Sequence, residues 1–306
     1  MSIMTAPRSL DRLTVSPYRE TVAYEYLYSR QGMTLKRISD LTSKSHRLPS
    51  VALDEESGLF PPEDIDRVRE FVNRKVASSE FHVAVEGTPL WPTGIRDSAR
   101  PSPIIYFRGD LDLLDTPRVS VVGSRKATED GLARASRIGR ELAEAGVTVV
   151  SGLAAGVDSV AMRSALKSRG KAGRGRVIGV IGTPIDEVYP KENAKLQSSI
   201  AESDLLFSQV PFYRYSMQPF RTKRYYFPER NELMAAVSQA TIIVEASDTS
   251  GTLTQARACL YQGRPLFILR SCLENEGVSW PRKWAARDGV SVIDSLDEVI
   301  ARTRRS

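Results

Sequence analysis

Glycine and hydroxyl residues stand together directly after several short β-branched runs of this sequence. The turns are Gly123-Ser124-Arg125-Lys126, Ser151 to Asp158 with Gly152 and Gly156, Gly182-Thr183-Pro184, and Ser250-Gly251-Thr252. Glycine lets an anionic oxygen approach backbone N–H groups, and the N-terminus of a following helix adds a partial positive charge. One such turn is typical of any tight strand-to-helix connection, but four on one sheet edge favour a phosphate site. Arg125 and Lys126 would supply its formal charge.

The familiar nucleotide fingerprints are missing from these turns. No GxGxxG follows the first run of this region, and the chain contains no GxxxxGK[ST]. The spacing therefore disfavours an enzyme that uses NAD or ATP, and we expect no cofactor.

Residues 211–230 combine aromatic and basic side chains. The segment PFYRYSMQPFRTKRYYFPER holds seven aromatic residues and five basic residues, Arg224 and Arg230 among them, against one acid. Bases of a single strand stack on aromatic faces while arginines hold the backbone, so the mixture is typical of single-stranded nucleic acid binding. Packing of these aromatics onto the domain, or onto a second copy, is an equally open interpretation.

Residue types that usually carry catalysis or metals are scarce. The two histidines, His46 and His82, lie outside the region of alternating runs. This disfavours histidine-based acid–base chemistry and a histidine-rich metal site. Cys259 and Cys272 form no CxxC pair. We expect no catalytic residues and no metal, and a reduced, cytoplasmic protein.

Short apolar runs bounded by glycine alternate with helical segments from Ile104 onward. The runs are 104–109, 119–123, 147–152, 177–182, 205–210, 241–246 and 265–269. Such runs are typical of parallel strands buried on both faces. Thr128 can cap a helix that Gly146 ends, with Leu132, Ala135, Ile138 and Leu142 on its buried face. The pattern predicts an α/β fold, an extended Rossmann-like, doubly wound and mostly parallel sheet that binds ligands at the carboxyl ends of its strands.

The first part of the chain reads as helical. Tyr18–Leu41, interrupted at Gln31-Gly32, and Pro62–Val76 place apolar residues at helical spacing, and 42–61 has the composition of a linker. We predict an N-terminal helical region over residues 1–89 and a Rossmann domain over 90–306.

The formal charge of +6 and the pI of about 9.3 favour a polyanionic partner. No stretch approaches the roughly 20 apolar residues of a membrane span, and the N-terminus lacks the apolar core of a secretory signal. We therefore expect no membrane association.

Five motifs in this order resemble those of DNA-processing protein A, the DprA or Smf family. They are Val122–Lys126, SGLAAGVDSVA (151–161), GTPIDEVYPKEN (182–193), FPERNELMAAVS (227–238) and VEASDTSGTLTQA (244–256), and the resemblance covers about residues 90–270. It implies single-stranded DNA binding, a homodimer, and delivery of DNA to a RecA-type recombinase in DNA uptake and natural transformation, without a settled enzymatic activity.

The resemblance also implies which residues contact phosphates. The matching positions are Gly123, Ser124 and Arg125, then Ser151, Gly152 and Gly156, then Arg230 and Asn231, and finally Ser250, Gly251 and Thr252. Arg125 and Arg230 would be the main ligands.

Three positions depart from the family pattern and keep a second hypothesis open. Met162 replaces a usual histidine, Pro184 ends a usual GTG turn, and Glu232 follows Asn231 where arginine is usual. Because Met162 and Glu232 would reduce the positive charge of the pocket, a sensor of nucleotide ligands in a defence system is the alternative function.

An enzyme is the third and weakest hypothesis. The phosphoribohydrolases of the "lonely guy" type share the general fold but use PGGxGTxxE, whereas this chain has no PGG at 248–255 and carries Gln255 at the position of the carboxylate. An amide cannot act as a general base, and Glu245 is the nearest acid.

Overall fold

A computed structural model describes residues 15–56, 62–172 and 175–304 and shows one nine-stranded sheet. The strand order is β1-β2-β6-β5-β4-β3-β7-β8-β9. The strands are β1 (His82–Val85), β2 (Ile104–Gly109), β3 (Arg118–Gly123), β4 (Thr148–Ser151), β5 (Val177–Val180), β6 (Leu205–Ser208), β7 (Ala240–Glu245), β8 (Leu266–Leu269) and β9 (Val290–Ile293). All neighbours from β6 to β9 run parallel. The predicted Rossmann-like, mostly parallel fold is confirmed.

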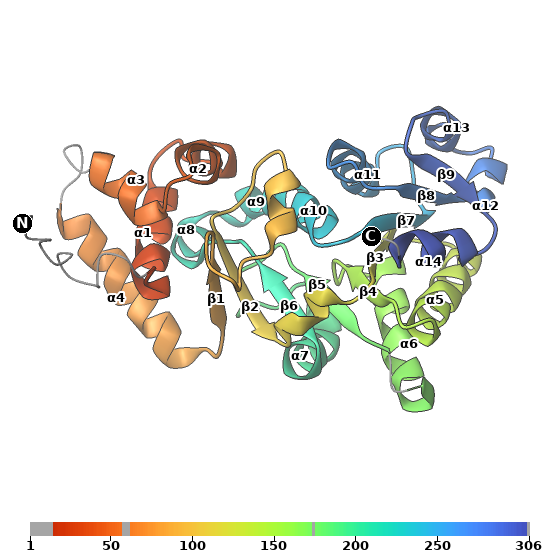
Figure 1. Cartoon of the computed structure of the whole chain (residues 1–306), viewed down its shortest axis with the longest axis horizontal. Helices are drawn as coiled ribbons and strands as arrows, with labels where there is room; N and C mark the ends of the chain where they lie inside the picture. Colours follow the sequence, from red (N-terminus) through yellow and green to blue (C-terminus); the bar gives the residue numbers. More distant parts are fainter. Residues whose placement is uncertain (1–14, 57–61, 173–174, 305–306) are drawn as a thin grey trace, which may run out of the picture.

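The chain winds outward from β3 in two directions, through β4, β5 and β6 on one side and through β7, β8 and β9 on the other. Helices cover both faces (Figure 1). One layer holds α5 (Glu129–Glu144), α6 (Val157–Ala172), α7 (Ala194–Ser203) and α14 (Asp297–Thr303), and the other holds α10 (Tyr226–Ala236) and α11 (Thr252–Tyr261). Between β3 and β7 the winding direction changes, and ligands of such sheets bind at that point.

Helix α5 shows how local sequence sets these elements. The Thr128 hydroxyl accepts a hydrogen bond from the Gly131 N–H and caps the helix, and Glu129 and Asp130 complement the positive end of its dipole. Ala135, Ile138 and Leu142 are buried on one face, as the helical spacing predicts. Gly146 ends the helix with a φ of 76°, a left-handed conformation that favours glycine.

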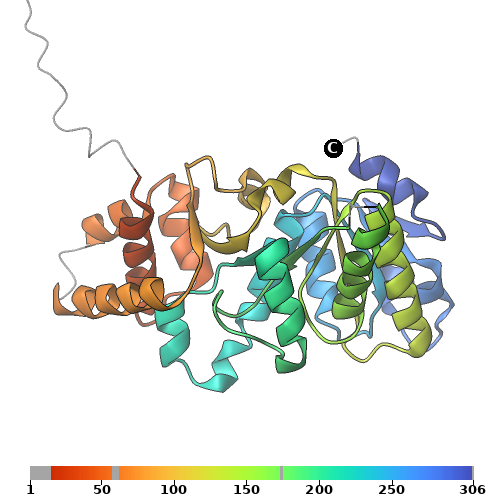
Figure 2. The same ribbon diagram turned by 90° about the horizontal axis from the view of Figure 1, so that it is seen from below.

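The N-terminal helices lie beside the antiparallel edge of the sheet (Figures 1 and 2). They are α1 (Pro17–Ser29), α2 (Leu35–Leu41), α3 (Pro49–Glu56) and α4 (Pro62–Ser78). The predicted break at Gln31-Gly32 separates α1 from α2, and Gly32 has a φ of 74°. Residues 42–61 were expected to be a linker, but α3 lies within them, and its Ala52 and Leu53 are buried in the core.

The expected direction of one strand of the sheet is wrong. β2 was expected to be parallel, but it pairs antiparallel with β6 and with β1. Its apolar run predicts burial on both faces and carries no information about direction. The sheet also begins inside the expected N-terminal region, because β1 starts at His82. The sheet thus includes a strand from each side of the predicted boundary between residues 89 and 90. As a boundary between folding units, that position remains a prediction.

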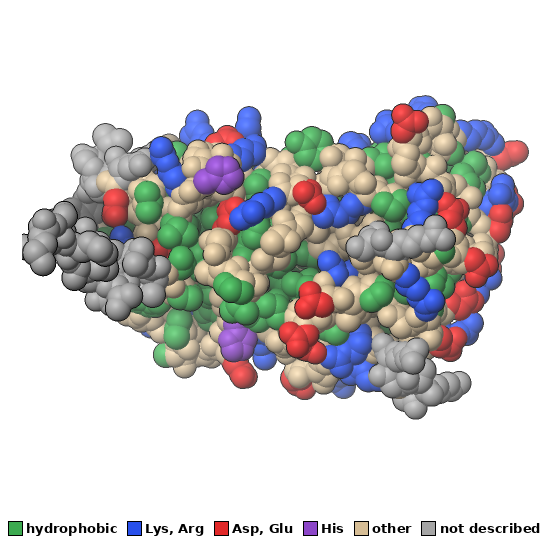
Figure 3. Space-filling model, viewed as in Figure 1, with side chains coloured by type: hydrophobic (Ala, Val, Ile, Leu, Met, Phe, Trp, Pro, Cys, Tyr) green, Lys and Arg blue, Asp and Glu red, His purple; other side chains and the backbone are tan. Residues whose placement is uncertain are grey.

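Charges of both signs are interspersed on the face shown in Figure 3. Lysine and arginine side chains alternate there with aspartate and glutamate, notably over the half that carries α5 and α14. The net charge of +6 is therefore not spread over this face as one basic surface.

Candidate functional site

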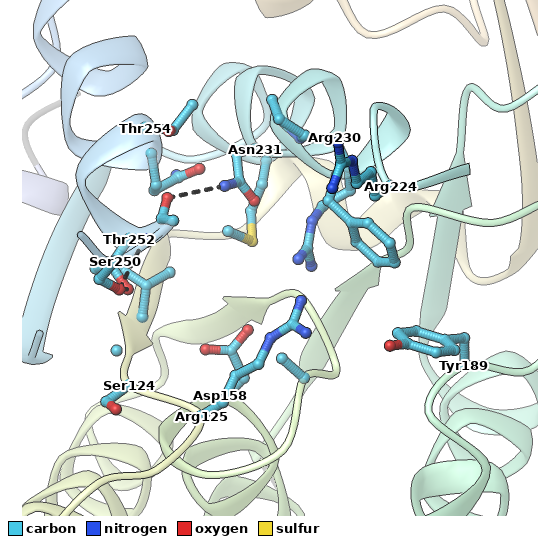
Figure 4. A pocket seen from close by; sticks show the side chains of 18 of the residues that line it. Ser124, Arg125, Asp158, Tyr189, Arg224, Arg230, Asn231, Ser250, Thr252 and Thr254 are labelled. Carbon is cyan, nitrogen blue, oxygen red and sulfur yellow. Dashed lines mark hydrogen bonds between the residues drawn. The ribbon is translucent and has the colours of Figure 1, made fainter. Parts of the chain in front are cut away.

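A pocket of about 810 Å³ lies where the winding direction of the sheet changes. It is lined by residues that follow β3, β4 and β7 and by residues of α10 and the segment before it. Figure 4 shows the loop that carries Ser124 and Arg125 on one side and the helix that carries Arg230 and Asn231 on the other. The carboxyl ends of parallel strands thus bring distant parts of the sequence together.

The turn after β3 contributes all of its predicted residues to the pocket lining. Gly123 is required by packing, since a Cβ there would lie 2.6 Å from Cγ2 of Val157. The Ser124 hydroxyl accepts a hydrogen bond from the Lys126 N–H at 3.1 Å, which closes the turn. The side chains of Arg125 and Lys126 are exposed, so both can meet a ligand.

The turn after β4 behaves differently from the expectation. Ser151, Gly152 and Gly156 do not line the pocket. The Ser151 hydroxyl donates to the backbone carbonyl of Val121 at 2.7 Å. A side chain on Gly156, whose φ is 79°, would overlap the carbonyl oxygen of Ser124. These residues support the residues that line the pocket and do not line it themselves. Their assignment as phosphate ligands remains a prediction.

Gly152 makes room for a buried arginine. A Cβ on Gly152 would overlap the guanidinium group of Arg230, whose Nη1 donates to the carbonyl of Val180 at 3.0 Å. Arg230 lines the pocket, and its Nε has no hydrogen-bond partner among the described residues. Burial lowers the pKa of Arg230 to about 10, although Asp158 acts in the opposite direction. The guanidinium therefore stays charged at neutral pH.

Asp158 also lines the pocket, and its charge favours the charged form of Arg230. Its carboxylate accepts a hydrogen bond from the Gly152 N–H at 3.1 Å and is buried. Burial raises the pKa of Asp158, and the charge of Arg230 counteracts that rise. Sequence reasoning did not select Asp158, although it stands inside the GVDSVA motif, because an acid is not expected in an anion site.

The N-terminus of α11 faces the pocket with Ser250, Gly251 and Thr252. The Ser250 hydroxyl accepts from the Thr252 N–H at 3.2 Å. Asn231 lies across from this turn and donates through Nδ2 to the Gly251 carbonyl at 3.2 Å (Figure 4). Apart from its chain neighbours, a Cβ on Gly251 would meet no atom of the described residues within 4 Å, so this glycine leaves open space at the pocket.

Residues 211–230, which we call the aromatic wall, divide between packing and the pocket. They form α8 (Phe212–Met217), α9 (Phe220–Lys223) and the start of α10. Phe212 and Tyr226 are buried, which supports the packing interpretation. Tyr215, Phe220, Lys223, Arg224 and Phe227 line the pocket, which supports the binding interpretation. Both interpretations of this segment therefore apply, to different side chains.

Four cations around the pocket lack acidic partners. Arg125, Lys126, Lys223 and Arg224 have no ion pair among the described residues, and all four line the pocket. Arg125 lies 5.6 Å from the ring centroid of Phe227, and the Lys223 ammonium lies 4.0 Å from that of Tyr215. Phe227 in turn lies 5.4 Å from Tyr189. The site thus combines unpaired positive charge with aromatic faces.

The three departures from the family pattern lie outside this pocket lining. Met162 is fully buried in the core. Pro184 lies in the turn after β5, where its carbonyl accepts from the Glu187 N–H. Glu232 pairs with the guanidinium of Arg100 through both carboxylate oxygens. None of them removes positive charge from the pocket, so the observation that motivated the nucleotide-sensor hypothesis does not hold.

Glu245, the acid considered for the enzyme hypothesis, is engaged in hydrogen bonds with Thr128. Glu245 accepts hydrogen bonds from the Thr128 N–H at 3.0 Å and the Thr128 hydroxyl at 2.6 Å. It does not line the pocket, whereas Gln255 does. Glu245 therefore secures the start of α5 at the end of β7.

A doubly wound sheet with a cation-lined pocket at its switch point is typical of α/β proteins that bind anionic ligands. The sequence profile of the DNA recombination-mediator protein A family matches residues 82–304, and the chain belongs to this family. The predicted resemblance to DprA and Smf proteins is confirmed.

Individual relatives and solved structures agree with this assignment. The chain is 29% identical over 288 residues to DNA processing protein DprA of Streptococcus pneumoniae, which covers 90% of this chain and 96% of the relative. It is 35% identical over 185 residues to Protein Smf of Synechocystis sp., and this match covers 59% of this chain and 44% of the relative.

The X-ray structure of the Streptococcus pneumoniae protein superimposes with a TM-score of 0.74 at 25% identity, covering 94% of this chain and 98% of that chain. DNA processing protein A of Helicobacter pylori, described with a single-stranded DNA binding mode, superimposes with a TM-score of 0.61 at 26% identity, covering 75% and 98%.

None of the helices in the described part of the chain has the length and apolar character that a membrane crossing requires.

Proposed function

We propose that this protein binds single-stranded DNA in the pocket between β3, β7 and α10. The observation that carries the proposal is a set of cations around one pocket that have no acidic partner among the described residues: Arg125, Lys126, Lys223 and Arg224. Phosphates attract such cations and release counterions on binding. Backbone N–H groups at the N-terminus of α11 add a partial positive charge on the same side.

Aromatic faces beside these cations favour a single strand over a duplex. Tyr189, Tyr215, Phe220 and Phe227 line the pocket, and Phe220 is 80% exposed. Unpaired bases can stack on such rings, whereas bases inside a duplex are already stacked on one another. Phosphate contacts together with stacking would give binding with little sequence preference.

Binding rather than catalysis fits the acids of the pocket best. Among the described residues that line it, Asp158 is the carboxylate, and it is buried and accepts a hydrogen bond from the Gly152 N–H. A buried carboxylate whose oxygen already accepts a backbone hydrogen bond is a poor candidate for proton transfer to a ligand. We propose that the protein is not an enzyme.

Family membership supports a wider role that we also propose. As a member of the recombination-mediator family, the protein would protect single-stranded DNA in the cytoplasm and load it onto a RecA-type recombinase during DNA uptake and natural transformation. A homodimer is part of this proposal. Sedimentation analysis of the mass, and RecA-dependent strand exchange with and without the protein, test these two parts separately.

Salt dependence of binding tests the phosphate contacts. Fluorescence anisotropy with a labelled oligonucleotide, single-stranded or duplex, would be recorded over a series of salt concentrations. Four contacts to a single strand predict a slope of log K against log salt of about −3. Stronger duplex binding, or a slope near zero, would contradict the proposal. Mononucleotides, added as competitors, should displace the oligonucleotide only weakly, and strong displacement would instead favour a nucleotide sensor.

Arg125→Ala tests the turn after β3. Because Arg125 is exposed and has no acidic partner among the described residues, its loss should weaken all oligonucleotides about equally and make the salt slope shallower by about 1. Arg137→Ala removes the same charge from the outer face of α5, away from the pocket, and is the matched control. Unchanged affinity of Arg125→Ala would remove this turn from the site.

A further inference from the structure

Helix α1 contacts the start of the aromatic wall at several points. Figures 1 and 2 show α8 against α1. The Tyr24 hydroxyl donates to the carbonyl of Gln209 at 2.8 Å, just before the wall begins. Phe81, which follows α4, packs on the wall residue Phe212 with ring centroids 5.1 Å apart, and Phe71 of α4 packs on Tyr213 at 5.2 Å. The N-terminal helices and the pocket therefore share one structural element.

Glu25 makes the central contact of this junction. Its carboxylate is fully buried and accepts hydrogen bonds from the N–H groups of Phe212 and Tyr213, both at 2.9 Å. It also accepts from the Tyr106 hydroxyl at 2.6 Å. The two N–H groups begin α8 and have no partner within that helix, so Glu25 satisfies donors that would otherwise be buried and unpaired.

Arg214 makes the reciprocal contact. Its Nη1 donates to the carbonyls of Tyr28 and Arg30 at 2.6 and 3.0 Å, at the C-terminal end of α1. Each helix thus places a charged side chain at the end of the other helix where the backbone dipole attracts it. The arrangement holds α8 at one position and orientation on α1.

We propose that Glu25 is a positioning residue of the DNA pocket, which holds the aromatic wall where its side chains line that pocket. Tyr215 lies two residues beyond the N–H groups that Glu25 binds, and Lys223 stacks on Tyr215. Release of α8 would therefore move an aromatic face and a cation together. This inference rests on the proposed function for its effect on DNA, but the position of the wall can be measured without DNA.

Glu20 provides a matched control on the same helix. It is a buried carboxylate of α1, and it accepts from the Ser50 N–H and hydroxyl at 2.9 and 2.8 Å. Ser50 belongs to α3, so Glu20 holds the N-terminal helices together and Glu25 holds the wall. Removal of either side chain leaves buried donors without an acceptor.

Affinity for a single-stranded oligonucleotide is the first measurement, on the full chain. Glu25→Ala should lower it about fivefold or more, and Glu20→Ala should change it less than about twofold. Equal losses in both variants, or full affinity in Glu25→Ala, would overturn the inference. If Glu25→Ala does not fold, Glu25→Leu, which fills much of the same space without an acceptor oxygen, takes its place under the same criteria.

A double-mutant cycle separates release of the wall from general damage. Lys223→Ala should lose most of its effect on affinity in the Glu25→Ala background, because Lys223 already lies out of place there. Lys126→Ala should keep its effect, since it follows β3 and does not depend on the wall. Additive effects of Glu25 and Lys223 would overturn the inference.

Limited trypsin digestion without DNA measures the wall directly. Cleavage after Arg221, Lys223 or Arg224 should be faster in Glu25→Ala than in the wild type, and unchanged in Glu20→Ala. Faster cleavage with no DNA binding by any variant would leave the positioning role intact and refute the proposed function. Unchanged cleavage in Glu25→Ala would overturn the positioning role, whatever the DNA binding shows.

Discussion

The Cα of Gly152 faces the guanidinium group of Arg230, and the Cα of Gly251 faces open space at the same pocket. The first glycine is required by the protein itself, because a side chain there would displace a buried arginine. No described residue beyond its chain neighbours requires the second to be glycine. At the residue scale, therefore, Gly251 is the glycine at which a phosphate of the proposed ligand could approach the backbone.

Gly251→Asp tests this distinction. Aspartate is favoured at the start of a helix, so we expect the melting temperature to stay the same or rise slightly. A carboxylate beside the phosphate path should lower affinity for single-stranded DNA about tenfold or more. Anisotropy and thermal melting measure the two effects. Gly251→Ser, a neutral residue that also suits this position, is the control, and equal affinity of the Asp and Ser variants would argue against a phosphate at this turn.

Helix α10 lines the pocket with one face and forms ion pairs with Arg100 through the other. Arg230 and Asn231 face the pocket, whereas Glu229 and Glu232 lie beside Arg100 on the other side. The spacing of the residues along one helix thus keeps the acids away from the phosphate site. At the element scale, the charge next to a site residue in sequence says little about the charge next to it in space.

Glu232→Arg follows from this arrangement. The change would replace an ion pair with two like charges in a partly buried position, so the free energy of unfolding should fall by about 3 kcal/mol. DNA affinity at a temperature where the variant is folded should stay within about twofold of the wild type, because the new side chain faces Arg100 and not the pocket. Denaturant unfolding and anisotropy check both statements. A large gain in affinity would show that Glu232 faces the ligand.

The junction between α1, β2, α8 and α10 makes stability depend on pH. Burial raises the pKa of both Glu25 and Glu229 to about 7. At Glu25, the hydrogen bond from Tyr106 and the charge of Lys75 act against this rise. At Glu229, the charges of Arg100 and Arg214 act against it, whereas the charge of Glu232 adds to it. The folded protein then holds these protons more tightly than the unfolded chain between about pH 4.5 and 7. The stability that these groups contribute is therefore present at low pH and lost as pH rises through 7.

Thermal melting between pH 5 and 8 measures this dependence. The melting temperature of Glu25→Gln should increase relative to that of the wild type as pH rises, since glutamine has no charge to bury. A difference that does not change with pH would contradict the raised pKa of Glu25.

At the scale of the whole molecule, one hydrophobic core runs from the N-terminal helices to the C-terminal helix. Tyr24 and Leu27 of α1 belong to the same cluster of buried residues as Val121 of β3 and Val299 of α14. β1 and β2 join the helices to the parallel strands. A boundary after residue 89 would cut this core and leave β2 as the edge of the sheet.

Two fragments test the folding units. The fragment 90–306 lacks β1 and Phe81, so it should melt at a lower temperature than the fragment 79–306 and aggregate through the exposed edge of β2. The full chain should unfold in one cooperative transition. Thermal melting with light scattering measures both, and a fragment 90–306 that is as stable as 79–306 and does not aggregate would support the predicted boundary.

Periodicity and turn chemistry in the sequence alone determined the parallel core and the position of its binding edge. The runs that became β3, β4 and β7 end in turns that meet at one pocket, because the carboxyl ends of parallel strands share an edge. These features depend on short-range patterns of buried and polar residues, so they can be recognised without a structure.

Only the tertiary structure decided which side chains of those turns reach the pocket. Ser151, Gly152 and Gly156 lie behind it, whereas Asp158 lines it. Glu232 turns to Arg100, and Glu25 reaches a helix more than 180 residues later in the chain. Such contacts form between segments that are far apart in sequence, and they depend on packing geometry that local residue types do not encode.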